Sequence, residues 1–468
     1  MPNLGLLTGT ARRTYGGFPS LPLTNLIAER SITEPTQFSL VSRPRLQKYL
    51  SSQWIGSEEI RALYYADGVL DGEKVGIVGQ SPADFYVGTE GDTVGTITGS
   101  DVPSIAGNSV GIIATCGGAV KFWDGTTYRT VTMPGGEDVV KVLDQGQRFI
   151  FICKGTHKYY WTAPGSNMLS AGNITVDSLN FASAESEPDA LLDGVVWSDH
   201  LVLAGLDTIE LHAVTLNDAA PWAPSIGSTI PRGVANTGAM TVFNGSFAWV
   251  SADRSVWLYG ANDKISNAGI EEFMRGWDVI RADRFFFEGR EFLHLWGDDG
   301  SGDLVYDAAT GEWTEFETDD GPFEGGPAIN IGSLYPVFGG KTTGRLLGMA
   351  TDAVLPGGGY SETTITYRFR CGVPMDAGQI TLNNVLLRCQ TFSSGSATAT
   401  LTFSRDKGAS WSSGRVVNLN EGIRHKIEWR SLGMFDQPGP LLDIEINGAT
   451  EFSVSGAMFN EPVQGRSR

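Results

Sequence analysis

The chain of 468 residues has little cysteine and little histidine. Its four cysteines, Cys116, Cys153, Cys371 and Cys389, are scattered along the sequence, with no C-x-x-C pair and no Cys/His spacing typical of a metal site. The five histidines form no H-x-x-x-H pair. We therefore expect reduced, buried thiols, no disulfide framework and no bound metal.

Long hydrophobic segments are also missing. No run of 18 apolar residues occurs, so no membrane-spanning helix is expected. The N-terminal sequence MPNLGLLTGTARRTYGG has neither an apolar core nor the small-residue cleavage site of a signal peptide. We expect a protein that is made in the cytosol and stays there or joins an assembly there, without a membrane anchor.

Sequence motifs of catalysis are equally scarce. The chain has no G-x-S-x-G elbow, no P-loop and no dinucleotide fingerprint. Cys153 and His157 are four residues apart, but in a strand this spacing places them on one face without a third partner, and core packing explains it better. We expect no enzymatic activity and no cofactor.

Basic residues are outnumbered. There are 53 Asp and Glu against 34 Lys and Arg, a net charge of −19, although only 19% of residues are charged. The acidic residues are therefore spread thinly, and neither the basic footprint of a typical nucleic-acid-binding protein nor a polybasic membrane patch is present. Composition alone indicates a soluble acidic protein.

What the sequence does contain is glycine (60 residues), aromatics and short apolar segments, with almost no helical periodicity. The segments are β-branched or aromatic and end at turn dipeptides such as Asp124-Gly125 and Asn244-Gly245, which is typical of strands joined by tight turns. The expected strands include 74–78, 110–114, 149–153, 201–204, 247–250 and 292–296. The chain is predicted to be all-β.

These strands recur at regular distances. Their starts lie near Gly76, Gly111, Phe149, Leu201, Phe247, Phe292 and Tyr335. A unit of about 40–50 residues with about four strands is the blade of a β-propeller, whose blades stack because one sheet cannot bury both faces alone. We predict an irregular propeller of six or seven blades over residues 55–355; a pair of unrelated sandwiches is the alternative.

Two further regions flank this propeller. Residues 1–54 contain Pro19, Pro22, Pro35 and Pro44 and few turn signals, and they are expected to form an extended arm and part of a platform. Beyond the glycine-rich segment 355–359, about seven alternating strands predict a small sandwich-like platform domain over residues 356–468.

One local motif stands out in the C-terminal region. Ser404, Asp406, Gly408 and Trp411 fit the Asp-box pattern S-x-D-x-G-x-[ST]-W. In this hairpin the carboxylate accepts backbone N–H groups, the glycine takes a positive φ and the tryptophan packs beneath, so its role is structural. Sialidases have several such boxes together with catalytic residues that are missing here, so a glycan hydrolase is only an alternative, as is a propeller scaffold suggested by the two Trp-Asp dipeptides.

Several segments along the chain contain residues in a distinctive order. These residues are Asn25, Glu29, Arg43, Pro44, Phe181, Glu185, Pro188, Asp189, Glu210, Arg232, Gly233, Trp429, Leu432 and Gly433. In these segments the chain resembles the packaged-DNA stabilisation, or tail hub (tail nozzle), proteins of short-tailed bacteriophages. The similar segments occur in the order found in that family, although Ile27, Ala28 and Arg45 depart from its usual residues.

The resemblance implies a structural virion protein of the tail. It would form a six-fold tube below the portal and its adaptor ring, with the propeller splayed outward and the terminal regions as the docking platform. Packaged double-stranded DNA would be held in the tube and would leave through it without sequence-specific binding. Spikes or fibres and a distal plug would attach to the outside and the tip.

This resemblance gives the net charge a possible role. An acidic lumen would repel phosphates and let the duplex slide, whereas basic residues would grip it. The alternative is that the acidic residues lie on the outer surface and keep the protein soluble. The sequence does not choose between the two.

Overall fold

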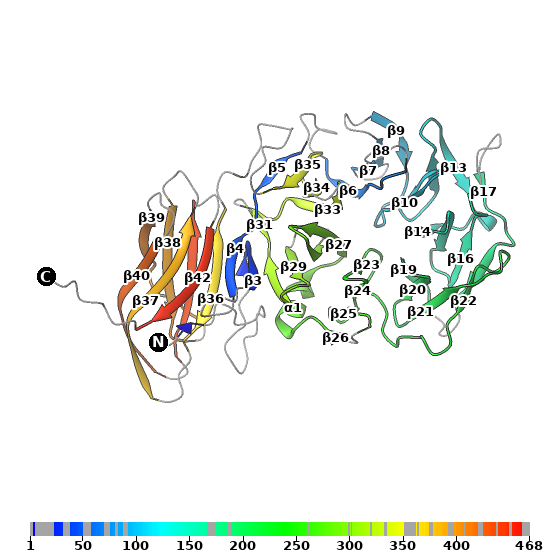
Figure 1. The fold of residues 1–468 in the computed structure, drawn as a ribbon. Coiled ribbons are helices and arrows are strands. Elements are labelled where there is room, and N and C mark those ends of the chain that lie inside the picture. The colour runs from blue at the N-terminus through cyan, green and yellow to red at the C-terminus, as the bar shows by residue number, and fades with distance from the viewer. Residues whose placement is uncertain are drawn as a thin grey trace.

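The computed structural model describes residues 3–4, 23–30, 38–49, 58–69, 75–79, 83–87, 92–165, 174–184, 189–260, 263–297, 300, 302–318, 321–331, 335–350, 362, 365–373, 378–391, 397–406, 408–419, 425–436, 439–448 and 452–460. Over these residues it is almost entirely β-structure. Seven antiparallel blades form a ring beside a second body of two sheets (Figure 1). The all-β and propeller predictions are confirmed, with seven blades.

Each blade has four strands that follow one another in the chain, with two exceptions. A short strand added to blade 2 comes between the third and fourth strands of blade 3, and the last blade takes its fourth strand from near the N-terminus. Blade 1 is formed by β6 (Ile60–Tyr64), β7 (Val75–Val78), β8 (Ala83–Val87) and β9 (Asp92–Ile97); blade 2 by β10 (Ser104–Asn108), β11 (Gly111–Thr115), β12 (Val120–Trp123) and β13 (Tyr128–Thr132), with β17 (Ile174–Thr175) added in parallel. Blade 3 is formed by β14 (Val139–Gln145), β15 (Arg148–Cys153), β16 (Lys158–Trp161) and β18 (Phe181–Ser183); blade 4 by β19 (Leu191–Trp197), β20 (His200–Gly205), β21 (Ile209–Val214) and β22 (Trp222–Pro224). Blade 5 is formed by β23 (Met240–Phe243), β24 (Ser246–Val250), β25 (Val256–Leu258) and β26 (Asp263–Lys264); blade 6 by β27 (Ile280–Phe287), β28 (Arg290–Gly297), β29 (Asp303–Asp307) and β30 (Glu312–Glu315); blade 7 by β33 (Gly325–Asn330), β34 (Pro336–Gly340), β35 (Leu346–Met349) and β5 (Leu46–Lys48).

The strands that recur in the sequence are the second strands of the seven blades. They are the most apolar because both of their faces are buried between neighbouring blades. In β15, for example, Ile150 and Ile152 pack toward blade 4, whereas Phe149 and Phe151 pack toward blade 2. Each of the seven seams between blades has its own hydrophobic cluster, including the seam between blades 7 and 1 that closes the ring.

Within the described residues, helical structure is confined to short elements. Asn267 caps the helix α1 (Ala268–Phe273) by accepting hydrogen bonds from the amides of Gly269 and Ile270. The described part of the propeller also contains the 3₁₀ turns η2 (Pro134–Gly136) and η3 (Met274–Gly276) and the small hairpin of β31 (Glu317–Thr318) and β32 (Gly321–Pro322).

The second body is a sandwich of strands from both termini around one large hydrophobic core. One sheet has the order β3 (Leu26–Arg30), β4 (Phe38–Ser42), β42 (Phe452–Phe459), β37 (Gln379–Thr391), β40 (His425–Asp436), with β1 (Asn3–Leu4) also paired to β42. The other has the order β2 (Leu23–Thr24), β36 (Tyr367–Gly372), β41 (Leu441–Asn447), β38 (Ala397–Ser404), β39 (Arg415–Leu419). The described part of residues 1–54 therefore consists of short strands paired with distant sheets.

Two of these N-terminal strands join the sandwich to the propeller. β2 pairs in parallel with β30 and antiparallel with β36, so that blade 6 and one sandwich sheet form a continuous nine-stranded sheet. In β3, Leu26 and Ala28 lie in the sandwich core, whereas Ile27 between them lies in the core shared by blades 6 and 7. Because successive side chains of a strand point to opposite faces, β3 contributes to both the sandwich core and the core between blades 6 and 7.

We predict that Leu46→Ala destabilises the chain by about 2–5 kcal/mol. Leu46 belongs to β5, is fully buried between blades 6 and 7, and supports the strand that completes blade 7. Urea unfolding measures the change. Leu179→Ala, at a position 80% exposed, is the matched control and should cost less than about 0.5 kcal/mol. Equal losses for the two variants would contradict the role of β5 in closing the propeller.

Candidate functional site

The N-terminal residues singled out in the sequence meet at the junction between the propeller and the sandwich. Arg43 is fully buried there, and its two terminal nitrogens bind the two carboxylate oxygens of Glu362 at 2.8 Å each. Its guanidinium also donates to the carbonyls of Pro44 and Glu317 and lies over the rings of Phe316 and Phe323. Such a two-pronged pair is the strongest kind of ionic hydrogen bonding available to arginine.

Asn25 completes this junction. Its φ of 58° lies in the left-handed region, which asparagine tolerates better than most residues. Its side-chain oxygen accepts hydrogen bonds from Arg43 Nε at 2.7 Å and from the amide of Glu317, and its Nδ2 donates to the carbonyl of Thr366. One buried amide thereby connects the N-terminal segment, blade 6 and the sandwich.

Glu29 lies on the adjoining strand. Arg290 of blade 6 pairs with it at 3.4 Å and also donates to the carbonyl of Ala28 and to Asp307. The four N-terminal residues thus share one structural task, which is to fasten the first strands to blade 6 and to the C-terminal domain. Glu362, the partner of Arg43, was not among the residues singled out from the sequence, where no motif marks it.

The central family-like residues shape blade 4 and its neighbours. Asp189 accepts hydrogen bonds from the amides of Asp207 and Thr208 and from the Thr208 hydroxyl, which fixes the turn between β20 and β21. Gly233 lies against this turn so closely that a Cβ would stand 2.2 Å from the carbonyl oxygen of Gly205. Glycine is therefore required there by close backbone approach.

Arg232, Glu210 and Phe181 lie apart from one another. The Arg232 guanidinium stacks 3.8 Å from the centre of the Trp257 ring. Glu210 is buried beside His212, whose pKa is lowered by burial although Glu210 opposes this effect. Phe181 lies on the outer strand of blade 3. Glu185 and Pro188 fall outside the described residues.

The C-terminal residues belong to the sandwich. Trp429 and Leu432 are buried in its core, and the indole N–H of Trp429 donates to the carbonyl of Arg415 on the neighbouring edge strand. Gly433 has a φ of 105°. The structure thus places the family-like residues in three separate regions: the junction, blade 4 with its surroundings, and the sandwich.

The Asp box forms the turn between β38 and β39. Asp406 accepts hydrogen bonds from the Ser410 amide at 2.7 Å, from the Ser410 hydroxyl and from the Ser404 hydroxyl, and Gly408 has a φ of 97°. These bonds, those from Ser410 above all, lower the pKa of Asp406 to about 2. The ring of Trp411 lies beside Gly408 and near Arg370. All of these contacts stabilise the hairpin.

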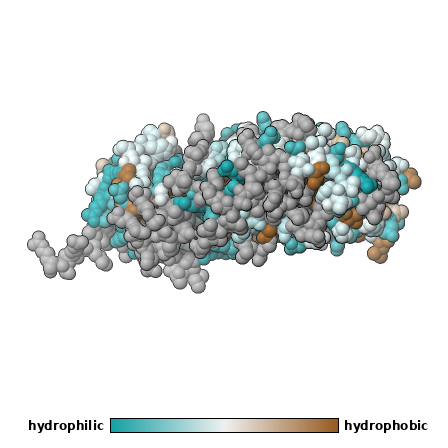
Figure 2. Space-filling model, turned by 90° about the horizontal axis from the view of Figure 1, so that it is seen from above, coloured by the Kyte–Doolittle hydropathy of each residue, from teal (hydrophilic) through white to brown (hydrophobic). Residues whose placement is uncertain are grey.

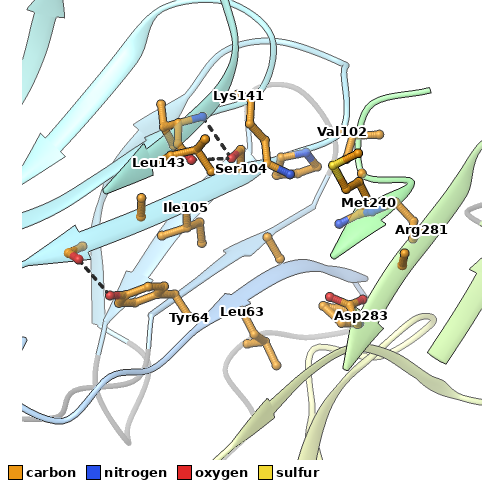
Figure 3. Close-up of a pocket in the computed structure, with 18 of the residues that line it drawn as sticks. Leu63, Tyr64, Val102, Ser104, Ile105, Lys141, Leu143, Met240, Arg281 and Asp283 are labelled. Atoms are coloured by element: carbon orange, nitrogen blue, oxygen red, sulfur yellow. Dashed lines mark hydrogen bonds between the residues drawn. The ribbon is translucent and has the colours of Figure 1, made fainter. Parts of the chain in front are cut away.

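A cavity of about 340 Å³ lies on the axis of the propeller (Figure 3). Residues from the innermost strands line it, and Lys141 within it forms an ion pair of 2.6 Å with the buried Asp193. Arg281 donates across the ring to the carbonyl of Arg61. The hydroxyl of Tyr64 donates a hydrogen bond to the carbonyl of Gly107. Burial raises the pKa of Tyr64 to about 12. The polar groups of this cavity thus hold blades together.

The part of the chain that the structure describes was searched for metal-binding clusters and membrane-spanning helices. There, no group of three or more His, Cys, Asp or Glu side chains is placed to hold a metal ion, and no helix is long and apolar enough to cross a membrane. The four cysteines are free and buried. Burial raises the pKa of both Cys371 and Cys389 to about 12, so these two thiols stay protonated at neutral pH.

Comparison with known proteins agrees with the motifs. Residues 84–295 match the family model described as the β-propeller of bacteriophage P22 Gp10, a phage stabilisation protein. Over 242 residues the chain is 26% identical to the tail hub protein gp10 of Salmonella phage P22, a match that covers 47% of this chain and 50% of that protein. The chain resembles the phage tail hub family. The resemblance drawn from the sequence is confirmed, and the chain spans about half the length of this curated relative.

Two solved structures also match part of this chain. Both are crystals of BBS1N in complex with ARL6DN, one soaked with mercury and one with lead. They are 9% and 10% identical to this chain, with TM-scores of 0.41 and 0.42, and each match covers 67% of this chain and 99% of the other.

We predict that Glu362→Gln lowers the free energy of unfolding by about 3–5 kcal/mol, because it removes the charged carboxylate that pairs with the buried Arg43 guanidinium. The double variant Arg43→Met with Glu362→Leu should recover much of this loss, since it removes both charges. Glu272→Gln, which breaks an exposed pair with Arg275, is the control and should cost less than about 1 kcal/mol. Denaturant unfolding provides the comparison; a mild effect of Glu362→Gln would contradict the role assigned to the pair.

We also predict that the stability of the Asp-box hairpin depends on pH. The folded-state pKa of Asp406, about 2, is below its unfolded value, so its stabilisation is complete above the unfolded pKa and is lost as the pH falls through the folded pKa. Peptides covering residues 404–412 should therefore exchange amide hydrogen faster in Asp406→Asn than in the wild type at pH 5. This difference should disappear as the pH approaches 2; a constant difference would contradict the ionised carboxylate's role.

Proposed function

We propose that the chain is a structural protein of a short-tailed phage: the tail hub that docks below the portal and its adaptor ring, retains packaged DNA and conducts it during ejection. The match of residues 84–295 to the P22 Gp10 propeller carries this proposal. The similarity to the P22 tail hub protein supports it. The protein would act in the virion tail after assembly in the host cytoplasm, and it would have no enzymatic activity.

The dimensions of the propeller bear on how DNA would pass. The axial cavity of about 340 Å³ has the size of a small-molecule pocket. A duplex whose major groove alone is about 12 Å wide cannot pass through it. DNA conduction therefore requires a tube formed between several copies, which fits a homohexamer whose closed ring uses head-to-tail contacts.

The distribution of charge sharpens the hypothesis of an acidic lumen. Residues 55–355 hold 41 acidic and 17 basic residues, a net charge of −24, whereas residues 1–54 have a net charge of +4 and residues 356–468 of +1. An acidic lumen thus requires propeller surfaces to line the tube. A lumen lined by the sandwich alone would be close to neutral.

Assembly with other tail proteins completes the proposal. The strands of both termini share one sandwich, which is suited to be the platform that docks on the adaptor ring because it is a single body held by one core. Spike or fibre proteins and a distal plug would bind elsewhere on the hub. The double-stranded DNA would be a passing ligand, bound without sequence specificity.

Electron microscopy of phage particles labelled with an antibody to this chain tests the proposal. We expect the label at a single vertex, on a tube that shows six-fold symmetry. Purified protein added to polysaccharides should release no reducing sugar. Label on the capsid faces would refute the hub assignment, and turnover of polysaccharide would favour the glycan-hydrolase alternative.

A further inference from the structure

Three titratable side chains meet in the hydrophobic seam between blades 6 and 7. Asp303 begins β29, His294 lies on the neighbouring strand β28, and Lys341 directly follows β34. His294 Nε2 is 2.7 Å from one carboxylate oxygen of Asp303, Oδ1, and Lys341 Nζ is 2.6 Å from the other, Oδ2. Asp303 and Lys341 are 38 residues apart in the sequence, so the packing of the two blades brings them together.

The environment of this group is the reverse of the molecular surface. Seen from above, the described residues at the surface are mostly hydrophilic or neutral, with hydrophobic residues scattered among them (Figure 2). In the seam, the side chains of His294 and Asp303 are fully buried and that of Lys341 is 10% exposed. The imidazole ring of His294 packs among aromatic side chains, which are Phe285, Trp296, Phe323 and Phe338.

Such surroundings favour the loss of charge from the Lys341–Asp303 pair. Lys341 Nζ lies 5.2 Å from the centre of the Trp296 ring, and little water reaches it. Charged groups are costly to bury, and the transfer of one proton from Lys341 to Asp303 removes both charges at once. The result is a neutral amine in contact with a neutral carboxylic acid.

The backbone fixes both reacting groups. The N–H of Lys341 donates to the carbonyl of Glu324 at 2.9 Å, and the Glu324 carboxylate accepts hydrogen bonds from Thr342 and Thr343 in the turn that follows β34. Asp303 is held in the ladder between β28 and β29. Reacting groups that are held in contact in this way reach effective molarities of about 10⁵–10⁸ M.

His294 presents an N–H group to the Asp303 carboxyl group. Its other ring nitrogen, Nδ1, is buried and has no hydrogen-bond partner among the described residues. Because a buried N–H without an acceptor is costly, the proton of the neutral ring belongs on Nε2. His294 therefore donates to Oδ1, whereas Oδ2 faces Lys341 and is the oxygen that takes the lysine proton.

We propose that Lys341 and Asp303 form an intramolecular isopeptide bond. After the proton has moved from Nζ to Oδ2, the lone pair of Nζ attacks Cγ and forms the N–C bond, while the π electrons of the carbonyl move to Oδ1. The N–H of His294 stabilises the negative charge on Oδ1. One Nζ proton then passes to the Oδ2 hydroxyl, the C–Oδ2 bond breaks with its electron pair, and Oδ1 forms the carbonyl again. The products are one amide and one water, and His294 is unchanged, so no oxidant, metal or co-reactant is needed.

The isopeptide bond joins the two blades at which the propeller closes. Asp303 belongs to blade 6, which is continuous with the sandwich, and Lys341 belongs to blade 7, which β5 completes. A covalent link between such distant positions restricts the unfolded chain and thereby stabilises the fold. The reaction occurs once in each chain and is not the turnover of a substrate. It needs only the folded chain, so it is independent of the proposed function.

A second buried lysine–aspartate pair provides an internal comparison. Lys141 Nζ is likewise 2.6 Å from a carboxylate oxygen of the fully buried Asp193. However, both oxygens of Asp193 accept backbone N–H groups, Oδ1 from Gly194 and Oδ2 from Gly238. A proton on either oxygen would weaken one of these hydrogen bonds, which favour the ionised carboxylate. We therefore expect the Lys141–Asp193 pair to remain ionic.

Mass spectrometry of the intact, denatured protein tests the proposal. We expect the wild-type chain to be lighter than its sequence by one water, and its tryptic digest to contain a branched peptide that joins Lys341 to Asp303. Lys341→Arg should have the full mass of its sequence, because a guanidinium is not a nucleophile, whereas Lys141→Arg, the matched control, should still lack one water. A wild-type chain with its full mass would overturn the proposal, as would a branched peptide that joins Lys141 to Asp193 instead. The decisive measurement is made on the wild type and does not depend on the folding of a variant.

The role of His294 is tested by the rate of the reaction. Protein made by cell-free synthesis is sampled over time, and the fraction that has lost water is measured by mass. We expect His294→Phe, which keeps an aromatic ring but removes the N–H, to form the bond at least about 100-fold more slowly than the wild type. His212→Phe, a change to a buried histidine of blade 4, is the control and should leave the rate unchanged. An unchanged rate in His294→Phe would contradict the part of the proposal that concerns this residue.

Discussion

The arrangement of the whole chain depends on one buried ion pair. Arg43 and Glu362 are 319 residues apart in sequence, yet they meet with two hydrogen bonds in a site from which water is excluded. A guanidinium in such a site is costly unless its countercharge and acceptors are all present. Asn25 and the carbonyls of Pro44 and Glu317 supply further acceptors. The first strands, blade 6 and the segment leading to the sandwich must therefore assemble together.

This constraint explains why the N-terminal segment has so many partners. Within 26 residues, the chain adds β2 to blade 6, places β3 and β4 in the sandwich and provides β5 to blade 7. Propellers need a device that joins the last blade to the first, because blades stacked in a ring are otherwise held only by their seams. Here the strand next to Arg43 closes the ring, and Leu46 N–H also donates to Glu362. Ring closure and attachment of the sandwich thus share the same residues.

The sequence predicted the propeller well because its strongest signal comes from strands buried on both faces. All seven recurring segments are second strands, as β11 and β15 illustrate with every residue buried. The innermost strands line the axial cavity and contain polar residues such as Lys141 and Asp144, so periodicity alone did not reveal them. The pairing of β2, β3 and β5 was beyond prediction because local pattern does not determine the partner of a short strand. Glu362 could not be found for the same reason: the pair is defined by a contact across the fold.

Charge is also divided unequally between the propeller and the sandwich. Residues 55–355 hold an excess of acid larger than that of the whole chain, while the segments that build the sandwich have a small positive balance. The net charge of the whole chain, −19, therefore describes neither the propeller nor the sandwich. The propeller and the sandwich therefore present surfaces of different net charge to their surroundings. In the proposed ring, repulsion between acidic propellers would favour self-contacts through the nearly neutral sandwich, whereas an acidic lumen would need propeller surfaces to line the tube. The charge of the propeller therefore sets these two arrangements against each other.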